Sequence, residues 1–304
     1  MTLLLGSILT SIFILFGVYS LASSSVLVSE RSGTVNISIE GTMIMGAITQ
    51  LVLLSPNGAG MIELGVVGIL LSLLVAGAIG SIFGLLLGIA VITFKGDHVI
   101  VGTALNLLAP VLSLMIAITV FGTTSGGNSP PSPLRPGNFD YLSLVFMGIG
   151  IMVLFGSWFY LAKTKSGLRL KSAGENPYSL ETAGVSVSRQ RYMALIVAGF
   201  LGGMSGAMAS HTFTNFQHTV TGMGFIAIAI LIFGQWRVAG ITLGVIIMAI
   251  LFGTMTQWLH FGWSIPREVV MMIPYILPIV VLVFMKKSNS PRALGKSFKK
   301  DERD

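Results

Sequence analysis

Long apolar runs dominate this chain, and several of them reach the length of about 18 residues at which a run reads as a membrane-spanning helix. Soluble domains average about 25% charged residues, whereas only 10% of these 304 residues are charged. Because a spanning segment must satisfy its own backbone hydrogen bonds, such runs predict an all-α, polytopic bundle of membrane helices. Residues 1–22 lack the basic start of a signal peptide, so we expect them to form a retained first span.

The apolar runs predict about nine spans, and eight or ten also fit the pattern. The expected spans lie at about 3–22, 37–54, 62–92, 99–121, 141–162, 193–213, 222–234, 238–258 and 269–285. The third run, 31 residues long, exceeds a straight crossing and is expected to tilt or to include a re-entrant or surface piece. The seventh run is short enough to be a half-helix.

The positions of the basic residues predict which side of the membrane each loop faces. Cytoplasmic loops carry an excess of Lys and Arg. If the N-terminus lies outside and the spans alternate, sixteen of the eighteen Lys and Arg fall on the cytoplasmic side, with Arg135 and Arg267 as the exceptions. We therefore expect an outer N-terminus, a transmembrane domain over 1–285 and a basic cytoplasmic tail over 286–304.

Glycines recur at intervals of four residues in two of the runs, which brings them to one face of each helix. The positions are Gly80, Gly84, Gly88, Gly199, Gly203, Gly202 and Gly206. Small residues at this spacing let helix backbones approach closely. We expect tight packing within the chain, with an interface between subunits as the alternative.

A polar segment at 163–192, here called the basic loop, interrupts the apolar runs and contains six of the eighteen basic residues. Within it, Asn176 can cap a short helix, Pro177 suits the first helical position and Gly184 can end the helix. A short helix held between membrane spans is suited to docking a partner. The alternative is a loop that merely satisfies the charge rule.

Motifs typical of enzymes and metal sites are missing from the sequence. HExxH and GxSxG do not occur, and the absence of Cys excludes disulfides and thiolate metal sites. Glu40 is the one acidic residue expected well inside a span, which is little for a carrier driven by an ion gradient. We expect no catalytic residue, metal or cofactor in this chain. Its net charge of +7 favours contact with anionic membrane lipid rather than nucleic acid.

Several stretches resemble one transporter family. The loop sequence GLRLKSAGENPYSLETAGVSVSRQRYMAL resembles the main cytoplasmic loop of ABC-importer permeases of the branched-chain amino acid, ribose and nucleoside superfamily. Residues 29–47, 95–109, 222–236 and 266–284 resemble the nucleoside/simple-sugar branch. The resemblance covers most of the chain in the expected order, and the chain looks like the shorter of two paired permeases.

The resemblance implies a transport subunit in the cytoplasmic membrane rather than an enzyme. Its implied partners are a second permease subunit, a cytoplasmic ABC ATPase with two nucleotide-binding halves and an extracytoplasmic substrate-binding lipoprotein. ATP and Mg would be bound by the ATPase. The implied substrates are nucleosides; the alternatives are a simple sugar such as ribose, or an ion-coupled secondary carrier.

The resemblance also places the contact with the ATPase in the basic loop. The implied contact residues are Glu175, Asn176, Pro177, Glu181, Thr182, Ala183 and Gly184. Thr182 stands where the family commonly has Ala, a minor change because Thr still allows close contact.

Four residues are candidates for the substrate pathway, because buried polar groups in a membrane are costly unless paired and often mark a route. They are Asn36, Glu40, Asn106 and Phe225. Each also has a structural interpretation: Glu40 could bond within or between helices, with Arg31 as one partner, Asn106 could join two helices, and Phe225 could pack in the core.

Overall fold

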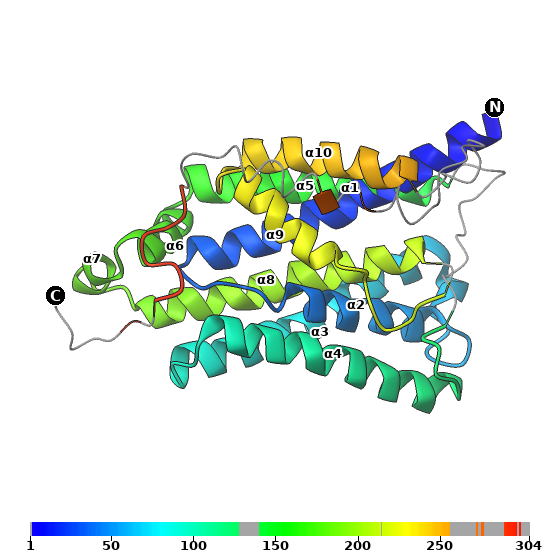
Figure 1. Ribbon diagram of the computed structural model, residues 1–304, viewed down its shortest axis with the longest axis horizontal. Coiled ribbons are helices and arrows are strands. Elements are labelled where there is room, and N and C mark those ends of the chain that lie inside the picture. The colour runs from blue at the N-terminus through cyan, green and yellow to red at the C-terminus, as the bar shows by residue number, and fades with distance from the viewer. Residues whose placement is uncertain are drawn as a thin grey trace.

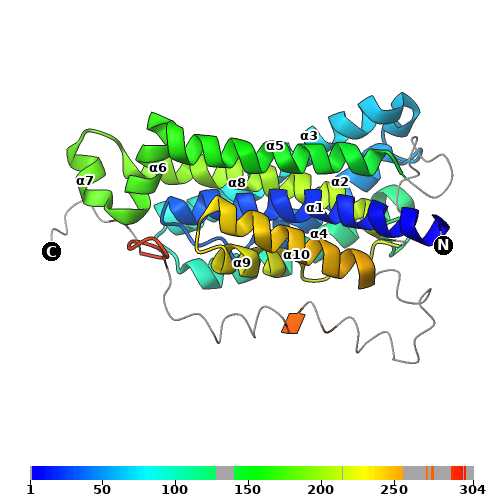
Figure 2. The same cartoon turned by 90° about the horizontal axis from the view of Figure 1, so that it is seen from above.

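The computed structural model describes residues 2–127, 140–213, 215–255, 272, 275–276, 289–296 and 298. These residues form a bundle of helices that run along one long axis (Figures 1 and 2). The helices are α1 (Thr2–Arg31), α2 (Ile39–Leu54), α3 (Gly65–Gly88), α4 (His98–Phe121), α5 (Leu142–Lys163), α6 (Lys165–Glu175), α7 (Pro177–Thr182), α8 (Val187–Ala209), α9 (Met223–Phe233) and α10 (Val238–Met255). Short helical turns lie at Met61–Leu64, Ile89–Thr93 and Ser210–Thr212.

The described helices agree with most of the expected spans. Six of them are long and apolar enough to cross a membrane, and α2 and α9 are shorter apolar helices. The third expected span is continuous over Met61–Thr93 and ends in a π-helical turn. The ninth expected span, 269–285, falls almost wholly outside the described residues. The described part of the chain therefore contains six helices that could span a membrane and two shorter apolar helices, and the expected total of about nine spans stays a prediction.

The first helix is longer than expected. It ends at Arg31, whereas the apolar run suggested an end near residue 22. Residues 23–30 include four serines and Glu30, yet they are buried in the bundle. Two of the serine hydroxyls bond to backbone carbonyls: Ser25 Oγ donates to Ala198 O at 2.6 Å, and Ser29 Oγ donates to Val26 O at 3.0 Å. Serine is tolerated in a membrane helix when its hydroxyl bonds to a carbonyl. A prediction from hydropathy alone therefore places the end of α1 too early.

Loops expected on the cytoplasmic side gather at the end of the bundle where α7 lies (Figure 1). Ala293 N donates to Gly174 O at 2.8 Å, and Gly295 N donates to Gly33 O at 3.0 Å. At the opposite end, Gly126 N donates to Phe216 O at 2.8 Å, which joins the loops after α4 and after α8. The described loops thus alternate between the two ends as the charge rule requires, while the orientation in the membrane stays a prediction. The division into domains at residue 285 stays a prediction as well.

The orientation can be tested with single cysteines, since the chain has none of its own. Asn57 and Lys165 are exposed at opposite ends of the bundle. We expect Asn57→Cys to react with an impermeant thiol reagent in intact cells, and Lys165→Cys to react only after permeabilisation. Labelling in the reverse order would show that the N-terminus is cytoplasmic.

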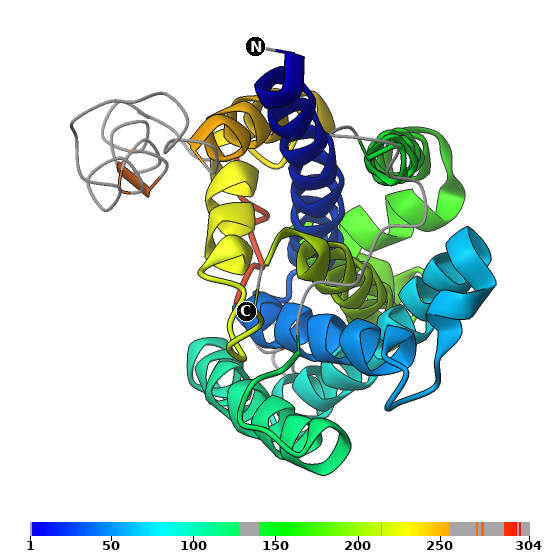
Figure 3. The same cartoon turned by 90° about the vertical axis from the view of Figure 1, so that its right-hand side faces the viewer.

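The centre of the bundle is the seam between α3 and α8, the most extensive contact between two helices. Viewed along the bundle, α8 lies inside a ring of the other helices (Figure 3). A Cβ added at Gly80 would overlap the carbonyl oxygen of Gly199, and one at Gly203 would overlap that of Ala76. The glycine spacing therefore serves packing within the chain, as expected, because only glycine lets these two backbones touch.

Candidate functional site

The basic loop is built from locally capped helices. Thr164 Oγ1 accepts from Gly167 N at 3.0 Å at the start of α6, and Asn176 Oδ1 accepts from Ser179 N at 3.2 Å at the start of α7. Pro177 occupies the first turn of α7, and Gly184 follows the helix with φ of +80°. These contacts show the short helix that the sequence predicted, and α6 is an additional helix in front of it.

One face of α7 is buried and the other is available. Pro177 and Leu180 pack toward the bundle, and Leu180 clusters with Ala173 and Val187. Five of the expected contact residues are exposed on the outer side: Glu175, Asn176, Thr182, Ala183 and Gly184. Glu181 is half-buried, and its Oε2 accepts from Val187 N at 3.1 Å, so it holds the return into α8. Of the seven expected contact residues, five are thus placed to meet a partner, whereas Pro177 and Glu181 shape the loop.

The basic loop is tied to the end of α1. The Nη1 atom of Arg31 lies 3.8 Å from Glu175 Oε1, and its Nη2 donates to Trp236 O at 2.6 Å. Partial burial and then the charge of Arg31 lower the pKa of Lys171 on α6. Arg31 therefore contacts both the last residue of α6 and the turn that follows α9.

Glu40 holds the start of the half-helix α9. Its Oε1 accepts from Gly222 N and its Oε2 accepts from Gly224 N, both at 2.8 Å. The N-terminus of a helix favours a negative charge and supplies unpaired N–H groups. A Cβ at Gly224 would lie only 2.7 Å from the backbone nitrogen of Glu40, so α2 and α9 touch here. The suggested bond between Glu40 and Arg31 is wrong, because Arg31 binds Trp236 and Glu175 instead.

The two asparagines lie near the start of α2. Asn106 Nδ2 donates to Ile37 O at 2.8 Å, and its Oδ1 accepts from Gly41 N at 2.7 Å, so the amide joins α4 to α2. Asn36 is buried, and its Oδ1 accepts from Ser38 Oγ at 2.9 Å. Both contacts are structural, and a role of either residue in the pathway stays a prediction.

Phe225 follows the glycines that Glu40 binds and has 52% of its surface exposed. Among the described residues, Phe225 is therefore not packed in the core, contrary to the alternative considered for it. Three of the four pathway candidates lie around the start of α2, and Phe225 extends this region along α9. The structure thus brings them into one neighbourhood without showing that substrate passes there.

Sequence reasoning missed that Glu30 is buried inside the bundle like Glu40. Glu30 is 5% exposed at the end of α1, and Trp236 Nε1 donates to its Oε2 at 2.7 Å. Glu40 is therefore not the one acid well inside the bundle. The two partners are 206 positions apart, and no local pattern in the sequence could have paired them.

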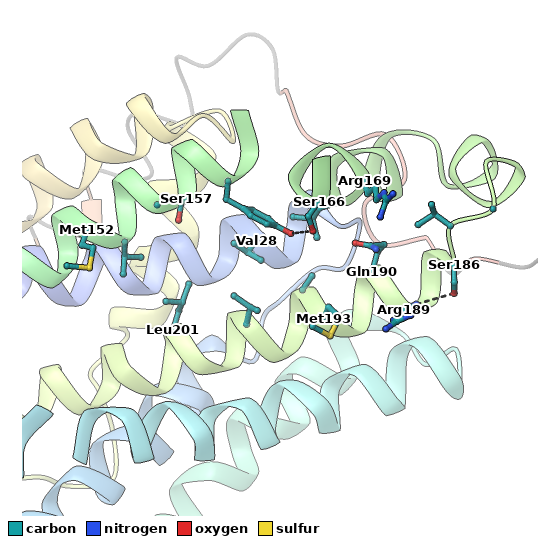
Figure 4. Close-up of a pocket in the computed structure, with 18 residues that line it drawn as sticks. Val28, Met152, Ser157, Ser166, Arg169, Ser186, Arg189, Gln190, Met193 and Leu201 are labelled. Carbon is teal, nitrogen blue, oxygen red and sulfur yellow. Dashed lines mark hydrogen bonds between the residues drawn. The ribbon is translucent and has the colours of Figure 1, made fainter. Parts of the chain in front are cut away.

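A groove of about 1110 Å³ runs between α5 and α8 beside the basic loop (Figure 4). Apolar side chains such as Met152 and Leu201 line its deeper part, and Arg169, Arg189 and Gln190 lie toward the loop. The described lining residues include no carboxylate. The groove joins the apolar surface of the spans to the cationic loop, a surface suited to the membrane lipid expected around this protein.

Comparison with known proteins identifies the family. The sequence model for the permease component of the branched-chain amino acid transport system matches residues 8–282. The chain belongs to this family. It is a permease subunit of an ABC transporter and a multi-pass protein of the cytoplasmic membrane, and it is not an enzyme.

Individual relatives are similar over nearly their whole length. The permease is 34% identical to the guanosine ABC transporter permease protein NupQ of Bacillus subtilis, over 90% of this chain and 91% of that protein. It is 33% identical to the nucleoside ABC transporter permease protein NupC of Lactococcus lactis, over 90% of each chain. No solved structure matches the permease.

Proposed function

We propose that the permease moves nucleosides inward across the cytoplasmic membrane as part of an ATP-driven importer. The observation that carries this proposal is the near full-length similarity to two permeases named for guanosine and nucleosides. The neighbourhood of α2 and α9 is compatible with such a solute. It offers amides and an exposed aromatic ring, and the carboxylate of Glu40 is already bound by two backbone N–H groups. Nucleosides are uncharged and partly aromatic, so they need stacking and hydrogen bonds more than charge.

The proposed assembly contains a second permease, an ABC ATPase with two nucleotide-binding halves and an extracytoplasmic substrate-binding lipoprotein. Membership in the family supports an ATPase and further subunits in general terms. The permease is also 27% identical to NupP of Bacillus subtilis, a second guanosine ABC transporter permease protein of the organism that has NupQ. Two such permeases in one organism support a pair of permease subunits. In this proposal ATP and Mg are bound by the ATPase.

The exposed side of α7 is the proposed docking surface for the ATPase. It carries small residues at 182–184 and is held to α5 and α8 through the capped ends of the basic loop. Small residues allow a partner to approach closely, and the short rigid helix can pass the partner's movement on to the spans.

A simple sugar is the second candidate substrate. The permease is 31% identical to the putative glucose ABC transporter permease protein TsgC13 of Haloferax volcanii, over 77% of this chain and 70% of that protein. The shorter match makes a sugar the less favoured substrate.

Uptake by the reconstituted transporter tests the function. We expect ATP-dependent uptake of labelled guanosine or another nucleoside that requires this permease, its partner permease, the ATPase and the binding protein together. The permease alone should show no uptake, even with an ion gradient, which separates an importer subunit from a secondary carrier. Unlabelled nucleosides should compete and leucine should not. Competition by ribose or glucose without competition by any nucleoside would support the sugar instead.

A further inference from the structure

Arg191, near the start of α8, is a buried cation without a matching anion. Its side chain is 4% exposed, and its Nη1 donates to Lys296 O at 2.9 Å. Its Nε and Nη2 atoms are buried and have no hydrogen-bond acceptor among the described residues. The salt bridge found in the described part of the chain joins Arg31 to Glu175 and leaves Arg191 unpaired.

Such an arrangement is costly for an empty site. A buried charge is normally paired with an opposite charge, and a guanidinium in a protein does not lose its proton. Each buried N–H group without an acceptor adds a desolvation penalty. The uncompensated charge of Arg191 therefore favours an anion close to it.

A cavity of about 260 Å³ lies against Arg191, between α7 and the segment 289–298. Two further cations, Arg292 and Lys296, line it, and both are exposed. Glu175 is the one acid among the described lining residues, and it faces Arg31. The cavity exceeds the roughly 30 Å³ that one water molecule occupies in the liquid, so a tetrahedral oxyanion fits.

We propose that this cavity binds a small phosphate-type oxyanion, either free or as the headgroup of an anionic lipid. The guanidinium of Arg191 lines the cavity and supplies a positive charge that no carboxylate among the described residues balances. Arg292 and Lys296 supply further positive charge at the mouth of the cavity. This inference rests on the permease alone and does not depend on which substrate is carried.

Binding of the anion would fasten the C-terminal segment to the basic loop. That segment is already held by Ala293 N, which donates to Gly174 O, and by Gly295 N, which donates to Gly33 O. The rings of Tyr178 and Phe298 also meet, with centroids 5.3 Å apart. An anion between Arg191 and the two cations of this segment adds a further, ion-dependent connection beside the proposed docking surface.

The first test measures phosphate binding to the full-length permease in lipid-free detergent. Amide hydrogen exchange of peptides that cover 289–298 is followed against inorganic phosphate, with sodium chloride at matched ionic strength as reference. We expect phosphate to slow exchange in this segment, because it stabilises the bonds made by Ala293 and Gly295. Arg292→Gln combined with Lys296→Gln should weaken the apparent Kd at least tenfold. Both side chains are exposed, so this variant should fold.

The matched control is Lys165→Gln combined with Arg169→Gln, which removes the same charge from exposed positions on α6 outside this cavity. Its Kd should stay within about twofold of the parent. Arg191→Gln should remove phosphate protection altogether, and Arg191→Lys, which keeps the positive charge, should restore part of it.

The second test separates the two sources of the anion. The permease is placed in nanodiscs of phosphatidylcholine, with or without phosphatidylglycerol, in a buffer free of inorganic phosphate. Protection of 289–298 by phosphatidylglycerol identifies a lipid headgroup, and protection by free phosphate alone identifies a soluble anion; either result supports the site. If neither probe protects the segment, or if both double variants respond like the parent, the proposal is wrong.

Discussion

Replacing Gly184 with Trp is expected to reduce ATP-dependent uptake at least tenfold while the permease remains in the membrane. Gly184 has φ of +80°, and a Cβ built there meets no heavy atom within 4 Å. The folded permease therefore has room for the side chain, and the cost within the chain is the strain of a left-handed residue, about 1–2 kcal/mol. The indole would project from the exposed side of the loop after α7, where the ATPase is proposed to dock. Uptake and the ATPase rate of the purified transporter are measured together.

A matched control separates backbone strain from loss of docking. Gly60 also has a left-handed φ, +62°, and open space around its Cβ, but it belongs to the loop between α2 and α3, at the end of the bundle opposite α7 (Figure 1). Gly60→Trp imposes a similar strain and should leave uptake within about twofold of the parent. Equal uptake by the two variants would show that the exposed side of α7 does not carry the coupling.

A large loss of stability is expected from Gly203→Val in α8. A Cβ at this position would overlap the carbonyl oxygen of Ala76 and approach the Cα of Gly80 at 3.0 Å. These neighbours are backbone atoms that cannot move aside, so α3 and α8 must separate. Overpacking costs about 1–3 kcal/mol when side chains can adjust, and we expect a value at or above the upper end here. The measurement is the thermal unfolding midpoint of the full-length permease in detergent, together with its yield.

The control for this substitution is Gly148→Val in α5. A Cβ at Gly148 meets no heavy atom within 4 Å, so the same change of residue type adds no clash. Its unfolding midpoint should stay close to that of the parent. Similar losses in both variants would mean that valine in these helices, rather than the seam between α3 and α8, determines the effect.

Features that depend on neighbouring residues could be read from the sequence. Asn176, Pro177 and Gly184 act within a few positions of each other, and the structure shows the cap, the first turn and the left-handed residue that their order predicted. The packing role of the glycines in α3 and α8 could also be predicted from the sequence, because a spacing of four residues places them on one face of each helix.

Polar contacts between residues far apart in the sequence could not be predicted in this way. Glu40 was singled out as a buried acid, but its partners Gly222 and Gly224 lie more than 180 positions further along the chain. Arg191 looked like any other basic residue of its loop, and its burial depends on the packing of segment 289–296 beneath it. Hydropathy failed in α1 for a related reason, since Ser25 reads as polar until its acceptor on α8 is known.

The attachment of α9 at both of its ends has a mechanical consequence. Its start is held by Glu40, whereas its end passes into Trp236, whose indole bonds to Glu30 and whose carbonyl accepts from Arg31. Arg31 also faces Glu175, the residue before the cap of α7. We infer that a displacement of the basic loop reaches the far end of α9 through the guanidinium of Arg31, while Glu40 anchors the other end. The half-helix can thus pivot on a carboxylate inside the bundle, and its far end lies beside the loop that we propose docks the ATPase.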